Sequence, residues 1–115
     1  MRKLAITIAA AAPLAAFLAT PAAAFECPQH FADAQAVIDK VTNDMGGGMS
    51  QQMAREDMAL VHALLDDAKM LLEGAKHNHE KPQGAFDHAR AIAKADSAKA
   101  YATAADMLHF RMMQK

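Results

Sequence analysis

Apolar residues recur at intervals of three and four along three stretches of the chain, which is the spacing of one buried face of an α-helix. The first stretch, 28–43, begins with a proline that suits a first helical turn. It ends before three glycines at 46–48, where continued helix would be costly. The second stretch begins at Ser50, a favourable N-cap residue, and reaches about residue 77. We therefore expect two helices over these ranges.

The third stretch, from 82–85 to about 113, shows the same period. Asp96 and Ser97 lie either inside one long helix or at the cap of a new one, so the pattern allows three or four helices. The polar segment 78–84, which contains a proline and a glycine, predicts the turn before this stretch. No alternating run of β-branched residues indicates a strand. The predicted fold is all-α, an antiparallel three- or four-helix bundle.

The first 24 residues have the pattern of an export signal. Residues 1–3 carry positive charge, residues 4–18 are apolar apart from Thr7, with one interruption at Pro13, and residues 20–24 are mostly small. Fifteen apolar residues are fewer than the about 20 that a membrane-spanning helix requires. We therefore expect a signal peptide over 1–24 that is cleaved, a periplasmic location without membrane attachment, and one helical domain over 25–115.

Cleavage after Ala24 removes 24 of the 115 residues and leaves 91. Because Arg2 and Lys3 are removed, ten basic residues then face 13 acidic ones, a net charge of −3. The basic residues are scattered, whereas a nucleic-acid-binding domain concentrates them on one face. The chain contains no HExxH, no phosphate-binding glycine loop and no triad-like order of Ser, His and Asp. We expect neither a nucleic-acid partner nor an enzyme.

Methionine and histidine are abundant, with eight methionines and six histidines remaining after cleavage. Met49 and Met53 are four residues apart, and His109, Met112 and Met113 share a helical face. In a hairpin centred near residue 81, Met53 would face His109 and Met49 would face Met113. Thioethers favour Cu(I), and imidazole binds copper and zinc. The pattern predicts a copper site of these five residues, with gap-filling core packing as the alternative interpretation.

Two smaller groups are further candidates for metal binding. His77 and His79 lie beside the predicted turn, with His88 at the start of the next helix, and this set suits Zn(II) or Cu(II); the alternative is a solvated polar turn. Cys27 and His30 begin the mature chain, where a helix N-terminus would lower the pKa of the thiol and favour a metal site or a reactive thiol. Because Cys27 is the only cysteine, an intermolecular disulfide that forms a homodimer is the other interpretation.

The leader, the short helical chain and the alanine-rich helices dotted with histidine resemble the small periplasmic metal-binding helical proteins of proteobacteria. Residues 77–79 and 86–90 carry most of this resemblance. It implies binding of several divalent metals and a role in copper tolerance. The present chain has fewer histidines and more methionines than that family, which shifts the expectation toward copper, as Cu(I) or Cu(II), with zinc as the second choice.

The sequence thus predicts a non-catalytic periplasmic protein that buffers copper or delivers it as a copper chaperone to another envelope copper protein. The alternative is a periplasmic helical chaperone or adaptor, because flexible methionine surfaces also bind varied protein partners. The two hypotheses differ in one respect: a metal ligand stabilises the first kind of protein and leaves the second unchanged.

Overall fold

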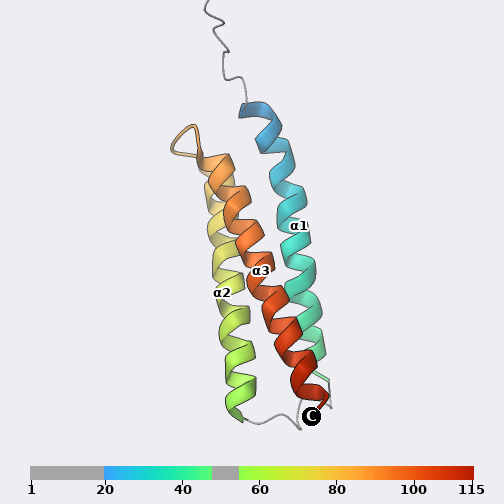
Figure 1. Ribbon diagram of the computed structural model, residues 1–115. Helices are drawn as coiled ribbons and strands as arrows, with labels where there is room; N and C mark the ends of the chain where they lie inside the picture. Colours follow the sequence, from blue (N-terminus) through green and yellow to red (C-terminus); the bar gives the residue numbers. More distant parts are fainter. Residues whose placement is uncertain (1–19, 48–54) are drawn as a thin grey trace, which may run out of the picture.

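The computed structural model describes residues 20–47 and 55–115, with side chains from residue 26 onward. In this part of the chain it contains three helices, α1 (Thr20–Met45), α2 (Arg55–Glu80) and α3 (Asp87–Met113). They pack side by side, with α2 antiparallel to both α1 and α3 (Figure 1). The prediction of an all-α helical bundle is confirmed. Residues 1–19 and 48–54 lie outside the description.

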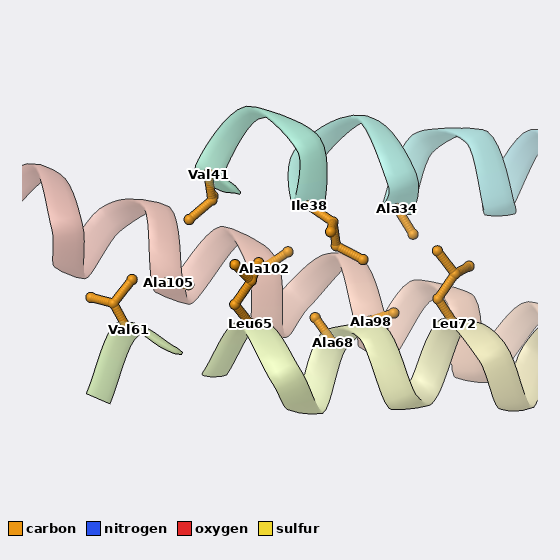
Figure 2. Close-up of a cluster of buried hydrophobic side chains, with 10 residues drawn as sticks. All are labelled: Ala34, Ile38, Val41, Val61, Leu65, Ala68, Leu72, Ala98, Ala102 and Ala105. Atoms are coloured by element: carbon orange, nitrogen blue, oxygen red, sulfur yellow. The ribbon is translucent and has the colours of Figure 1, made fainter. Parts of the chain in front are cut away.

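The core is made by one stripe of each helix, and its members follow one another at steps of three and four. Figure 2 shows side chains from all three helices converging on this core. Alanine supplies every buried apolar position of α3, so the helices approach closely while each side chain buries little apolar area. The buried apolar residues are Cys27, Ala34, Ile38, Val41, Val61, Leu65, Ala68, Leu72, Ala75, Ala91, Ala95, Ala98, Ala102 and Ala105.

The helix α3 is continuous through Asp96 and Ser97, which decides between the two predicted bundles in the described part of the chain. The Ser97 hydroxyl donates to the carbonyl of Ala93 at 2.8 Å, one turn back in the same helix. Asp96 reaches α1, where its Oδ1 lies 2.6 Å from Nδ1 of His30. Neither side chain caps a new helix, because both have partners that are compatible with helical backbone.

The helix boundaries differ from the predicted ones at several ends. The expected start of the first helix at Pro28 is wrong, since α1 begins at Thr20 and contains Pro28. A proline removes one helical hydrogen bond, and the alanine-rich residues before it favour helix. The predicted cleavage after Ala24 therefore falls inside α1 and stays a prediction. Among the described helices, none is both long and apolar enough to cross a bilayer.

Polar contacts between α1 and α3 show how these two parallel helices are aligned. Each pair joins residues 66 positions apart, as the bonds from His30 to Asp96 and from Lys40 to Asp106 show. The distance is 2.6 Å in both pairs. A constant separation over more than two helical turns means that the helices keep one register. This register sets the height of the first turns of α1 against α3.

The turn between α2 and α3 is closed by the buried carboxylate of Asp87. Its Oδ2 accepts hydrogen bonds from the backbone N–H groups of Gln83 and Gly84, and its Oδ1 lies 3.3 Å from Arg90. The bond from Gln83 is the main cause that holds the pKa of Asp87 below its ordinary value, against the opposing effect of burial. Because Asp87 requires the loop 81–86 to wrap around it, α3 begins later than the predicted 82–85.

The substitution Asp87→Ala is expected to destabilise the protein at neutral pH. A carboxyl group whose pKa is lowered by folding stabilises the protein above its unfolded pKa, and this contribution disappears as the pH falls through the lower folded pKa. The difference in unfolding free energy between wild type and variant should therefore be largest near pH 7 and shrink below pH about 4. Urea denaturation at several pH values measures this difference. A difference that stays constant down to pH 3 would contradict the role assigned to the carboxylate.

Candidate metal centre

The topology brings three separate chain segments to one end of the bundle. The first part of α1, the last turn of α2 and the first turn of α3 all lie at this end, beside the loop 81–86 (Figure 1). Cys27 comes from α1, His79 from α2 and His88 from α3. These three side chains form one cluster, which we call the Cys-His-His site.

Each residue of the site lies on the core stripe of its own helix. Cys27 lies seven residues before Ala34, His79 lies four after Ala75, and His88 lies three before Ala91. These steps keep a side chain on the core face of its helix. The site is therefore the last layer of the core, in which sulfur and imidazole replace the apolar side chains of the layers below.

The potential ligand atoms of the site lie close enough for one ion. The Cys27 Sγ and one ring nitrogen of each histidine are all within 4.8 Å of one another. An ion bound at about 2.3 Å from sulfur and about 2.0 Å from nitrogen would bring such atoms to roughly 3.5 Å apart. Contraction by about 1 Å is within the reach of side-chain rotation. Among the described residues this is the one group of His, Cys, Asp and Glu with such spacing.

The two histidines are packed but leave polar atoms without protein partners. Their rings contact each other at a centroid distance of 5.3 Å, and Phe31 packs edge-on against His79 at 5.5 Å. The Nδ1 atoms of His79 and His88 are both buried, and neither has a hydrogen-bond partner. An unsatisfied buried polar atom costs about 1–3 kcal/mol. A cation bound through these two nitrogens would accept their lone pairs and remove that cost.

The thiol of Cys27 is fully buried and interacts with the first turn of α3. Its S–H donates to the carbonyl of His88, with 3.6 Å between sulfur and oxygen. Burial raises the pKa of the Cys27 thiol, its own backbone hydrogen bond lowers it, and the charge of Glu26 raises it further. The predicted lowering by a helix N-terminus is wrong, because α1 begins seven residues earlier. A raised pKa argues against a reactive thiolate and leaves the thiol as a proton-exchanging metal ligand.

The site combines residues from two of the candidate metal-binding groups that were predicted separately from the sequence. Of the predicted turn group, His79 and His88 belong to it, whereas His77 is exposed and lies outside it. Of the predicted pair at the start of the domain, Cys27 belongs to it. His30 instead pairs with Asp96 on the α1–α3 interface. An intermolecular disulfide through Cys27 would require α1 to move away from the bundle, because the side chain is 0% exposed.

Three of the five residues of the predicted Met/His site are described, and they lie near the other end of the core. His109 is 8% exposed on the core stripe of α3, and Met112 packs against the hydrophobic cluster. Met113 is half-buried near the C-terminus. Met49 and Met53 lie outside the described residues. The packing of His109 and Met112 favours the core interpretation for these two residues.

The predicted register of the α2–α3 hairpin, on which the Met/His pairing depended, is wrong. A centre at residue 81 would place His79 opposite Gln83, but its ring contacts His88. Likewise Asn78 accepts a hydrogen bond from Lys94 at 2.5 Å. The loop closed by Asp87 is longer than the assumed turn, so each residue of α2 meets α3 further along the chain.

The donor atoms of the site would suit a soft to borderline metal ion. Thiolate and imidazole are the usual protein ligands of zinc and copper. No protein-family model matches the sequence, and no curated protein or solved structure is significantly similar to it. What the site can do therefore follows from its own geometry: a buried thiol and two half-buried imidazoles that together could hold a metal ion.

Proposed function

We propose that the protein is a non-catalytic copper-binding protein of the periplasm, which holds the ion between Cys27, His79 and His88 and serves as a buffer or chaperone. The observation that carries this proposal is the pair of buried, unpartnered Nδ1 atoms beside a buried thiol. A core layer evolved only for packing has no need of three groups with lone pairs at this spacing, and each unsatisfied nitrogen destabilises it.

The choice of copper rests on the donor atoms and on the expected location. A thiolate with two imidazoles suits Cu(I), Cu(II) and Zn(II), so the donors restrict the metal to this group. The leader-like residues 1–24 support export, and an exported domain with a single cysteine cannot be stabilised by an internal disulfide. The resemblance to small periplasmic metal-binding proteins supports the same function, with another envelope copper protein as the partner that delivers or receives the ion.

The proposal is tested by measuring copper affinity in competition with a chelator. The variants Cys27→Ser, His79→Ala and His88→Ala should each weaken binding by about 100-fold or more, because loss of a group that merely supports a ligand already costs 10- to 100-fold. His77→Ala is the matched control, since His77 is exposed two residues from His79. Its affinity should equal that of the wild type. Equal affinities in Cys27→Ser and His77→Ala would remove the Cys-His-His site from the proposal.

The alternative function, an adaptor for protein partners, draws on apolar side chains that remain exposed on the bundle. Met70 is 72% exposed and Tyr101 is 42% exposed, and both line a groove between α2 and α3. Such a surface would bind a partner equally well with and without metal. Cys27→Ser should weaken copper binding but leave the binding of a protein partner unchanged, so this variant also separates the two functions.

A further inference from the structure

We infer that the Cys-His-His site selects the monovalent ion Cu(I) over divalent ions such as Zn(II), an inference that rests on the proposed function of the same site. The first ground is the charge of the donor set. Cys27 contributes one negative charge as a thiolate, whereas His79 and His88 bind metals as neutral imidazoles. The complex with Cu(I) is therefore neutral, and the complex with a divalent ion carries one positive charge.

The surroundings of the site offer little to balance an additional positive charge. The cluster itself contains no carboxylate. Asp87 precedes His88, but its two oxygens are already occupied by Gln83, Gly84 and Arg90. Glu26 and Glu80 are the neighbours of Cys27 and His79 in sequence, but both are exposed, so solvent weakens the effect of their charges at the site. Because Cys27 and both Nδ1 atoms are buried, an unbalanced charge at this place is costly.

The number of ligands supports the same ion. In the described part of the chain the site supplies three donors, while protein zinc sites are almost always four-coordinate. Phe31 packs its ring edge-on against His79, so an apolar side chain adjoins one of the donors. Cu(I) is a soft ion that thiolate ligands select and that is stable with three donors.

Binding proceeds as a simple exchange of a proton for the metal ion. The S–H bond of Cys27 breaks and its proton passes to a water molecule or to buffer, and the sulfur lone pair then bonds to Cu(I). The Nδ1 or Nε2 lone pairs of His79 and His88 complete the set, and the oxidation state of the metal does not change. One proton is released for each Cu(I) bound.

The selectivity is measured on the purified protein without oxygen. Cu(I) is titrated against a Cu(I) chelator, and Zn(II) is titrated separately against a Zn(II) chelator at the same pH. Burial of an uncompensated charge costs several kcal/mol, so Cu(I) should bind at least about 100-fold more tightly than Zn(II). The X-ray absorption edge of the copper complex should be that of three-coordinate Cu(I) with one sulfur ligand.

A charge-adding variant tests the reason for the selectivity. In Phe31→Glu a carboxylate replaces the ring that packs against His79, and it offers a divalent ion both a fourth ligand and the missing negative charge. The affinity for Zn(II) should rise about tenfold or more, the effect of about 1.4 kcal/mol. The control Phe110→Glu makes the same change at an exposed position near the other end of α3 and should leave both affinities unchanged.

The outcomes separate the selectivity from the proposed function. Absence of Cu(I) and Zn(II) binding, or binding that Cys27→Ser does not weaken, overturns both. Binding through the three residues with Zn(II) as tight as Cu(I) overturns the selectivity alone. If circular dichroism shows that Phe31→Glu does not fold, the ratio of the two wild-type affinities decides.

Discussion

Saturation with Cu(I) is expected to raise the melting temperature of the protein by roughly 15 °C or more. A ligand that binds only the folded state at 1,000 times its dissociation constant stabilises by about 4 kcal/mol. In a domain of this size each kcal/mol corresponds to about 4 °C or more. The effect is large because the three ligands come from three helices, so unfolding separates them. Thermal denaturation followed by circular dichroism, with and without Cu(I), measures the shift.

Two variants serve as controls for this shift. Cys27→Ser should lose most of it, because the ligand from α1 is absent and the remaining histidines belong to one hairpin. His77→Ala should retain the full shift, since its side chain lies outside the site. A wild-type melting temperature that copper leaves unchanged would contradict metal binding to the folded bundle and would favour the adaptor function.

The helices and their core faces could be predicted from the sequence because they depend on local spacing. Ile38 and Leu65 occupy stripes whose steps of three and four are visible in the chain, and both are buried. The end of α1 at Met45 follows from the three glycines after it. These features need no knowledge of distant contacts, since helix propensity and amphipathic spacing act within one element.

The register of the hairpin could not be predicted, because it depends on one side chain in the turn. The Asp87 carboxylate accepts hydrogen bonds from the backbone of Gln83 and Gly84, and this loop delays the start of α3. The proline and the glycine of the segment 78–84 predicted a turn but did not indicate its length. The expected pairing of Met53 with His109 and of Met49 with Met113 was based on the shorter turn, and both Met49 and Met53 lie outside the described residues.

The Cys-His-His site was present in the sequence as two separate groups. In a three-helix bundle in which each helix runs antiparallel to the one before it, the start of the first helix, the end of the second and the start of the third lie at the same end. Extending each buried stripe toward that end by one or two helical turns reaches Cys27, His79 and His88. The signal was therefore the core periodicity combined with the helix count. Composition alone, with its many methionines, instead favoured the Met/His site.

The same alanine-rich core that positions the site leaves the fold dependent on a few larger side chains. Alanine fills the buried apolar positions of α3, so Val41, Val61 and Leu72 are among the largest fully buried residues. A small domain typically has a total stability of about 5–15 kcal/mol. One large apolar side chain therefore contributes a substantial share of the net stability, and a bound ion adds a contribution of similar size.

Leu72→Ala is expected to reduce the unfolding free energy by about 2–5 kcal/mol in the absence of metal, because it removes buried methyl groups and leaves a cavity. Leu72 is 2% exposed, at the level of Ala34 and Ala98 in the core cluster. Cu(I) should restore about 4 kcal/mol at high excess, since the ion joins the same three helices. Urea denaturation with and without Cu(I) measures both the loss of unfolding free energy in the variant and its recovery with the metal. Leu60→Ala is the control, because Leu60 is 51% exposed on the same helix and its loss should have a small effect. An equal loss of unfolding free energy in both variants would show that Leu72 is not part of a close-packed core.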